Sequence, residues 1–385
     1  MPPLPEPEPD PEALQHSQQL TRVIHQEIAD AGGWIPFARF MELALYAPAL
    51  GYYSAGAAKF GQAGDFITAP ELTGLFGKTV ARQVAQVLRL TGGDILEAGA
   101  GSGRLALQLL TALEQLEALP AHYYILEVSA DLQQRQRALI HDNAPRLADR
   151  VIWLNALPDS FRGVILGNEV LDAMPVHLVA WREDGLHEQG VSSEEGGFAW
   201  REQVLAYDPL LEAAKAIHVP ANYLSEINLG ARGFIASLAQ ILQQGIILMI
   251  DYGFGESEYY HPQRSQGTLM CHYRHQVHAD PFYMPGLQDI TAHVDFSAIA
   301  HAGIQSGLQL LGYTTQASFL LNCGITDILS ETSPENASTY LPLANQAQKL
   351  LSPAEMGELF KVMALGKGVS QPLTGFSAGD KSRLL

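Results

Sequence analysis

The stretch that most constrains the fold is DILEAGAGSG, residues 94–103. Ile95 and Leu96 are typical of the end of a buried strand, and an apolar helical pattern begins after Arg104. The three glycines between these patterns allow backbone conformations that other residues avoid, and they let a ligand approach the backbone closely. The stretch therefore predicts a strand, a glycine-rich turn and a helix that together hold a nucleoside cofactor.

The spacing of the glycines indicates the class of cofactor. The dinucleotide fingerprint is Gly-x-Gly-x-x-Gly, with a helix N-terminus directed at a pyrophosphate. Here the spacing is Gly-x-Gly-x-Gly, and Glu97 precedes Gly99 by two residues. A carboxylate attracts the sulfonium of S-adenosylmethionine, whereas it would repel a pyrophosphate. The pattern is that of Rossmann-like S-adenosylmethionine sites, although a glycine-rich turn alone also serves plain strand-to-helix connections.

Two further strands supply the rest of a nucleoside site. Residues 123–128 predict an apolar strand, with the acid Glu127 near its end. The Glu127 carboxylate can accept hydrogen bonds from both ribose hydroxyls of a nucleoside. The alternative is a solvated acid near the next helix, but its placement relative to the glycine turn favours the ribose. Residues 151–154 predict a third strand, with Asn155 and Ala156 at the end where adenine lies in this fold.

Polar side chains also follow the next buried strand, residues 163–168. Asn168 and Glu169 end this strand, and Asp172 comes three residues later. Because ligands of open α/β sheets bind beyond the carboxyl ends of the strands, these acids are placed to contact the acceptor of a transferred group. The alternative for Asp172 is helix capping.

Residues 59–72 are rich in glycine and aromatic residues and have no periodicity, which predicts a binding loop that includes Phe66 and Thr68. The alternative is a surface loop in which Thr68 caps a helix running to Leu88, with Glu71 in its first turn. Both interpretations can hold together. The residues assigned to the cofactor are Glu97, Gly99, Gly101, Gly103, Glu127, Val128, Asn155, Ala156, Asn168, Phe66 and Thr68.

The whole pattern predicts an α/β Rossmann-like fold with a seven-stranded, mostly parallel sheet. The other expected elements are helices 12–31, 37–46, 233–243 and 296–311, an antiparallel insertion over 176–205, and strands 245–251, 313–319 and 360–365. The predicted organisation is a disordered leader (1–11), a helical N-terminal cap (12–90), a core (91–370) with insertions at about 176–230, 255–295 and 320–355, and a tail (371–385).

Composition excludes some classes of function. The 41 acidic and 23 basic residues give a net charge of −18, which argues against a sequence-independent nucleic-acid binder and favours a cationic partner. The two cysteines fit a reducing compartment. No run is apolar enough for a membrane span, and the acidic, proline-rich start predicts a cytoplasmic protein without a signal or transit peptide. The histidines between residues 267 and 294 lack metal-ligand spacing, so we predict no metal site.

Several motifs together resemble one family, the MidA-like methyltransferases, which include the mitochondrial complex I assembly arginine methyltransferase. The matching stretches are 46–48 with 51–53, 64–71, 97–103, 167–175, 251–253 and 289–296. Ala69 departs from the serine that is common in this family, which weakens any role for a hydroxyl at that position. The resemblance implies S-adenosylmethionine as cofactor and, for the mitochondrial member, symmetric dimethylation of an arginine in a complex I subunit.

An arginine acceptor would need carboxylates that bind its guanidinium. Glu169, Asp172 and Glu71 are the acids that we predict as this clamp. Three residues are candidates to aid proton removal, and we predict His293 over Asp251 and Asp295. The predicted partner is a protein with an accessible arginine, and the sequence is also compatible with a homodimer. The alternatives are a small-molecule methyltransferase and a catalytically idle assembly chaperone.

Overall fold

The computed structural model describes residues 10–55, 68–274 and 276–385. The chain forms two compact units. Residues 67–171, 232–256 and 294–385 make up one, which we call the Rossmann-like unit. Residues 1–66, 172–231 and 257–293 make up the other, which we call the antiparallel unit.

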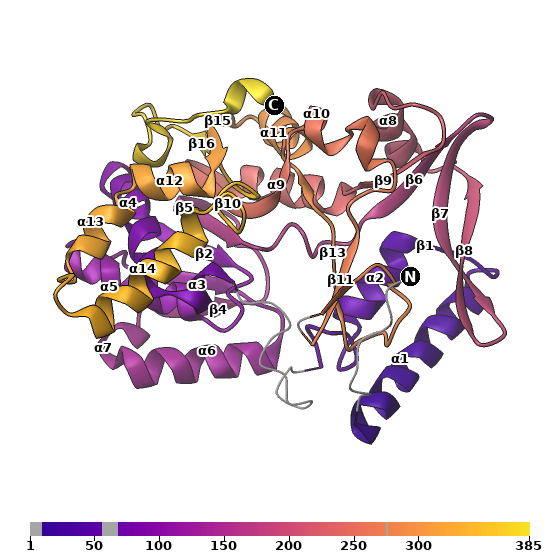
Figure 1. Cartoon of the computed structure of the whole chain (residues 1–385), viewed down its shortest axis with the longest axis horizontal. Coiled ribbons are helices and arrows are strands. Elements are labelled where there is room, and N and C mark those ends of the chain that lie inside the picture. The colour runs from indigo at the N-terminus through magenta and orange to yellow at the C-terminus, as the bar shows by residue number, and fades with distance from the viewer. Residues whose placement is uncertain (1–9, 56–67, 275) are drawn as a thin grey trace. The chain divides into compact units, whose positions relative to one another are not determined.

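The Rossmann-like unit is built on an eight-stranded sheet of order β15-β16-β10-β5-β2-β3-β4, with β14 paired to β10 (Figure 1). Its strands are β2 (Asp94–Ala98), β3 (Tyr123–Leu126), β4 (Val151–Leu154), β5 (Phe161–Asn168), β10 (Leu242–Phe254), β14 (Val294–Asp295), β15 (Gln309–Thr315) and β16 (Phe360–Lys367). Strands β4, β3, β2, β5 and β10 run parallel, whereas β16 is antiparallel to both β10 and β15. This is the α/β Rossmann-like class that the sequence predicts.

Helices cover this sheet because its central strands are apolar on both faces. In β10, residues 245–251 are all buried, as expected of a central strand in a parallel sheet. Alternate side chains Ile246, Leu248 and Ile250 join one hydrophobic cluster with α4 and α5. The helices that lie entirely in this unit are α3 (Ala69–Leu72), α4 (Gly74–Thr91), α5 (Arg104–Gln115), α6 (Ala130–Asn143), α7 (Pro145–Ala148), α11 (Phe296–Gln305), α12 (Gln316–Asn322), α13 (Ile325–Ser330) and α14 (Ala337–Leu351).

Three predicted elements are wrong in their bounds. The helix expected over 296–311 ends at Gln305, and β15 already begins at Gln309. Each of the other two elements is interrupted at a threonine. The helix expected from Thr68 to Leu88 is broken at Thr73, whose backbone is extended and whose hydroxyl accepts a hydrogen bond from the Leu75 N–H. The strand expected over 313–319 ends at Thr315, whose side chain caps α12 by accepting from the Ser318 N–H. In both places a threonine begins a new helix, a local signal that the apolar pattern hides.

The antiparallel unit contains a five-stranded sheet of order β1-β7-β6-β9, with β8 paired to β7, and a three-stranded sheet of order β12-β11-β13. Its strands are β1 (Ile35–Pro36), β6 (His177–Arg182), β7 (Gly185–Glu194), β8 (Gly197–Val204), β9 (Tyr223–Ile227), β11 (Met270–Tyr273), β12 (Gln276–His278) and β13 (Asp289–Thr291). Its helices are α1 (Pro11–Asp30), α2 (Phe37–Tyr46) and α8 (Asp208–Ala216). Helices α9 (Leu229–Ile241) and α10 (Glu256–Tyr259) lie where the chain passes between the units.

Helix α1 lies beside β7 (Figure 1) and buries Leu20, Ile24 and Ile28. Its first turn is capped by Asp10, whose carboxylate accepts from the Ala13 N–H at 2.9 Å. Residues 10 and 11, which were assigned to the leader, thus belong to the capped start of α1. The rest of the predicted leader, residues 1–9, lies outside the described part of the chain.

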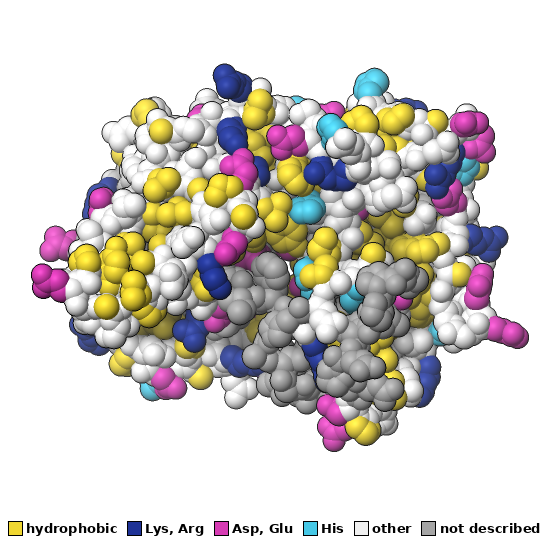
Figure 2. Space-filling model, viewed as in Figure 1, with side chains coloured by type: hydrophobic (Ala, Val, Ile, Leu, Met, Phe, Trp, Pro, Cys, Tyr) yellow, Lys and Arg dark blue, Asp and Glu magenta, His cyan; other side chains and the backbone are white. Residues whose placement is uncertain are grey.

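Acidic and basic side chains are interspersed on the face shown in Figure 2. Hydrophobic side chains gather there over α13 and α14, and Leu341 of α14 is 57% exposed. Among the helices of the described residues, none has the length and apolar character needed to cross a membrane.

Candidate functional site

The glycine turn between β2 and α5 adopts a conformation that glycine is suited to make. Gly99, Gly101 and Gly103 have φ of 63°, 53° and 87°, in the left-handed region that residues with a side chain rarely adopt. Among the described residues, a Cβ at Gly101 would meet no atom within 4 Å, so this glycine faces open space in that part of the chain. A Cβ at Gly103 would lie 3.1 Å from Gln136 Cγ, where α6 packs against the turn. The turn is therefore closed on its α6 side and open at Gly101.

Glu97 lies inside the sheet just before the turn. Its side chain is 2% exposed and accepts a hydrogen bond from the Tyr123 hydroxyl at 2.7 Å. Burial raises the pKa of Glu97 to about 7, the hydrogen bond from Tyr123 opposes this rise, and the charge of Glu127 adds to it. A nearby cation stabilises the ionised form of such a buried carboxyl group.

Glu127 follows β3 directly and is 8% exposed. Its carboxylate accepts from the Ser129 N–H at 2.9 Å and from Gln136 Nε2 at 3.4 Å. Burial raises the pKa of Glu127, whereas these hydrogen bonds lower it. Because a carboxylate has about four acceptor positions, it retains capacity for ribose hydroxyls.

An apolar and amide surface lies beside Glu127 at the same sheet edge. Val128, the second residue after β3, is 77% exposed, which is unusual for a valine so close to a strand in the sheet. Asn155 and Ala156, which follow β4, are also exposed. Gln133 of α6 donates to the Asn155 side-chain oxygen at 3.0 Å and to the Glu127 carbonyl at 2.6 Å, so the two strand ends are connected. This surface suits an adenine ring, which needs an apolar face and polar partners at its edge.

Gln136 connects the glycine turn to Glu127, and the sequence did not single it out. It is fully buried, donates to the Gly101 carbonyl at 2.8 Å, and accepts from Trp153 Nε1 at 2.8 Å. A glutamine at a core-facing position of an otherwise apolar helical pattern was the available signal, but its partners are distant in the chain. Gln136 therefore holds the turn in place through its backbone.

Asn168 is the last residue of β5, the strand next to β2, and Glu169 follows it directly. Asn168 Nδ2 donates to Glu169 Oε1 at 2.9 Å. Asn168 Oδ1 is buried and finds no hydrogen-bond partner within residues 10–55, 68–274 and 276–385. A buried acceptor of this kind carries a cost unless a ligand supplies a donor. The ammonium group of S-adenosylmethionine is such a donor, so Asn168, the open space at Gly101 and exposed Val128 fit this cofactor.

Glu71 lies in α3 and contacts the glycine turn within the same unit. Its carboxylate accepts from the Ser102 hydroxyl and forms an ion pair with Arg104 at 2.6 Å between Oε2 and Nε. Thr68 has an extended backbone before α3, and Phe66 lies outside the described residues. The carboxylate that was predicted for a substrate guanidinium thus already binds the guanidinium of Arg104.

Asp172 and His293 belong to the antiparallel unit. Asp172 is 6% exposed, and its carbonyl accepts from the Ala292 N–H at 3.0 Å. This bond places Asp172 beside the residue that precedes His293 in the chain. The His293 N–H donates to Thr268 Oγ1 at 3.0 Å, and Thr268 Oγ1 donates to buried Glu226 at 3.2 Å.

Tyr53 and Asp289 add a polar group to this unit that the sequence did not assign. The Tyr53 hydroxyl donates to both carboxylate oxygens of Asp289, at 3.0 and 3.1 Å. Burial raises the pKa of Tyr53, and the charges of Asp289 and Asp172 raise it further. The carboxylates of Asp172 and Asp289 therefore both act on Tyr53 electrostatically.

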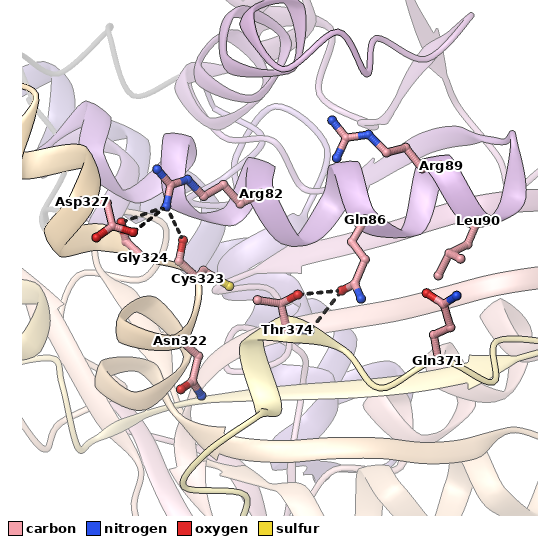
Figure 3. A pocket seen from close by; sticks show the side chains of 10 residues that line it. All are labelled: Arg82, Gln86, Arg89, Leu90, Asn322, Cys323, Gly324, Asp327, Gln371 and Thr374. Carbon is pink, nitrogen blue, oxygen red and sulfur yellow. Dashed lines mark hydrogen bonds and ion pairs between the residues drawn. The ribbon is translucent and has the colours of Figure 1, made fainter.

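A surface cavity of about 440 Å³ in the Rossmann-like unit is separate from these residues (Figure 3). Its polar side chains are engaged in holding the C-terminal segment: Gln86 contacts Pro372 and Thr374, and Asn322 donates to the carbonyls of Gly375 and Ala378. Arg82 binds the Cys323 and Gly324 carbonyls and Asp327. Gln86, Asn322 and Arg82 of the cavity lining thus each bind other parts of the same unit. Within the described residues, no group of three or more His, Cys, Asp or Glu is arranged to hold a metal ion.

A mainly parallel α/β sheet with Gly-x-Gly-x-Gly after its first central strand and an acid after the next defines the nucleoside site of a Rossmann-like methyltransferase. Comparison with known families agrees with this class. Residues 79–314, well over half of the chain, match the family described as "Putative S-adenosyl-L-methionine-dependent methyltransferase". The chain belongs to this family of enzymes, whose cofactor is S-adenosyl-L-methionine.

Individual relatives match most of the chain. Protein arginine methyltransferase NDUFAF7 of Danio rerio is 29% identical, over 91% of this chain and 88% of its own. The NDUFAF7 homologue of Drosophila melanogaster is 28% identical, over 98% and 92%. A Burkholderia thailandensis protein crystallised with S-adenosyl-homocysteine is 51% identical, with a TM-score of 0.95 over 99% of this chain and all of that one. The resemblance predicted from the motifs is confirmed.

Proposed function

We propose that the protein transfers methyl groups from S-adenosylmethionine to an arginine side chain of a partner protein. The observation that carries the proposal is the carboxylate of Glu169 at the carboxyl end of β5, the strand next to β2 and its glycine turn. The named activity of the NDUFAF7 relatives, which match this chain nearly end to end, supports an arginine acceptor. By the same resemblance we propose a symmetrically dimethylated product and a respiratory or other protein partner.

The chemistry of arginine explains why acids matter here. A guanidinium has a pKa above 12, so it is protonated and weakly nucleophilic at neutral pH. Carboxylates that bind two of its nitrogens hold the positive charge there and leave the third nitrogen to attack. S-adenosylmethionine, when bound, supplies an electrophilic methyl group. The residues of this chain then have to position the nucleophile in line and accept a proton.

We assign these tasks to the predicted residues. Glu169 and Asp172, three residues apart in the chain, are the proposed guanidinium ligands. Glu71 joins them only if it exchanges Arg104 for the substrate, and its ion pair with Arg104 supports its ability to bind a guanidinium. His293 is the proposed proton acceptor, with its backbone held by Thr268.

Labelling tests the proposal. The purified protein is incubated with S-[methyl-³H]adenosylmethionine and a cell lysate, and labelled protein is hydrolysed to identify the methylated amino acid. We expect label in dimethylarginine with the native chain and at least about 100-fold less with Glu169→Gln, because the attacking nitrogen loses its positioning. Label on small molecules alone would instead identify a small-molecule methyltransferase. Absence of any label and of S-adenosylhomocysteine binding would identify an assembly chaperone.

The cytoplasmic location, the homodimer and the lack of nucleic-acid binding stay predictions from the sequence. Cell fractionation tests the location, and sedimentation equilibrium of the purified chain tests the dimer. A protein recovered with membranes, or sedimenting as a monomer, would contradict the first or the second prediction.

A further inference from the structure

Asp251 lies at the end of β10, beside the end of β5, and its carboxylate is almost entirely enclosed. Ile250 is in register with Asn168 in the parallel pair of strands. The Asp251 side chain is 1% exposed. Its Oδ2 accepts hydrogen bonds from the backbone N–H groups of Val170 and Leu171, at 3.1 and 2.9 Å. Its Oδ1 accepts from the Tyr252 N–H at 2.9 Å.

These bonds hold a turn with an unusual backbone. Glu169 has φ of 52°, a left-handed conformation that is strained for a residue with a side chain. The Glu169 N–H donates to the Ile250 carbonyl at 2.8 Å, and the next two N–H groups are those that Asp251 binds. Ile250 and Asp251 of β10 therefore accept hydrogen bonds from three consecutive N–H groups of the turn that carries Glu169.

The same turn also packs against the glycine turn. A Cβ at Gly99 would come within 3.1 Å of Val170 Cγ2, so Val170 lies directly over this glycine. Val170 is thus fixed on its backbone side by Asp251 and on its side-chain side by Gly99. The position of Glu169 relative to the cofactor turn follows from these two contacts.

We propose that Asp251 is a positioning residue, which sets the location of the Glu169 carboxylate through the backbone of Val170 and Leu171. This inference rests on the proposed function, in which Glu169 binds the acceptor. The carboxylate form is required because both oxygens accept from N–H groups. An asparagine in its place would turn an NH₂ group toward Tyr252 or toward Val170 and Leu171, and donors would face donors.

The first measurement is hydrogen exchange, which does not depend on activity. In Asp251→Ala, which removes both side-chain oxygens, we expect the amides of Val170 and Leu171 to exchange at least about tenfold faster, because they lose their acceptor. Amides in the middle of β5 should not change. Asp295→Ala is the matched control, because Asp295 is also a strand-end acid but its carboxylate caps α11 and does not contact Val170 or Leu171. Unchanged exchange at Val170 and Leu171 in Asp251→Ala would overturn the proposal.

The second measurement is the initial rate of lysate protein labelling at saturating S-adenosylmethionine. We expect Asp251→Asn to lower this rate about 10- to 100-fold, with S-adenosylhomocysteine affinity within about threefold of the native value, because misplacement of one group acts on the reaction and not on cofactor binding. In a Glu169→Gln background the same change should cost less than about threefold, because coupled residues are not additive. An equal loss in both backgrounds would overturn the proposal.

The two measurements separate this inference from the proposed function. If Glu169→Gln labels protein arginine at the native rate, then the assigned role of Glu169 fails. The exchange rates of Val170 and Leu171 still decide whether Asp251 holds the turn.

Discussion

Two turns at the same edge of the sheet solve the same backbone problem in different ways. After β2, the chain uses glycines at 99, 101 and 103, all with positive φ. After β5, it places Glu169 in the left-handed region and holds it through Asp251 and the Ile250 carbonyl. The comparison teaches that a left-handed turn built from glycines leaves open space beside its backbone, whereas a turn with a glutamate in the left-handed region is strained and is held by a neighbouring strand.

The glycine turn should be the more sensitive of the two to added side chains. Gly101→Val is expected to weaken S-adenosylhomocysteine binding at least about 100-fold, because a β-branched residue is strained at φ 53° and would occupy the ligand's space. The fold should persist, since a Cβ there meets no atom of the residues that the structure describes within 4 Å. Calorimetry and circular dichroism measure the two effects. If Gly101→Val binds S-adenosylhomocysteine as tightly as the native protein, then the glycine turn does not contact the cofactor and the comparison fails.

The turn after β5 should show the opposite response to glycine. Glu169→Gly is expected to raise the free energy of unfolding by up to about 1 kcal/mol, because it relieves the left-handed strain, while protein labelling falls at least about 100-fold. Thermal unfolding and the labelling assay provide the measurements. A variant that is less stable and equally inactive would show that the side chain of Glu169 stabilises the turn.

Gln136 sharpens the comparison on the glycine side, where the backbone is held by α6. Gln136→Leu is expected to weaken S-adenosylhomocysteine binding about tenfold, because the Gly101 carbonyl and the Trp153 indole lose their partners. Gln134→Leu, at an exposed position of the same helix, is the control. Equal effects of both changes on affinity would remove Gln136 from the site.

The smallest expected effect concerns pH. Burial raises the pKa of Glu97 to about 7, and a cationic cofactor favours its ionised form, so S-adenosylmethionine should bind up to about tenfold more weakly at pH 6 than at pH 8. The stability of the cofactor-free protein should change with pH in the opposite direction. Because the pKa of Glu97 in the folded state exceeds its usual value of 4.5, the stability that protonated Glu97 contributes is lost as pH rises from about 4.5 to about 7. Calorimetry should show that the S-adenosylmethionine affinity of Glu97→Gln does not change with pH. If its affinity changes with pH as in the native protein, then another group causes the effect.

The sequence predicted those parts of the fold and site that depend on local pattern. The strand at 94–98, the glycine turn and the strand ends at 127 and 168 all follow from apolar runs and from glycine spacing. Gln136 and Asp251 could not be assigned their contacts in this way, because their partners lie on other elements. The ion pair of Glu71 with Arg104 was missed for the same reason, and it changes what Glu71 must do to meet a substrate.

The order of the strands also bears on how the chain folds. Strand β5 pairs with β10, yet residues 169–241 separate them, and β10 in turn pairs with β16 near the C-terminus. During synthesis, therefore, one edge of β5 has no partner strand until residues 169–241 and β10 have been synthesised. Slow pairing of central strands exposes apolar surface, so recovery of the chain from denaturant should depend strongly on protein concentration. The turn that carries Glu169 gains its hydrogen bonds to Ile250 and Asp251 only when β10 pairs with β5.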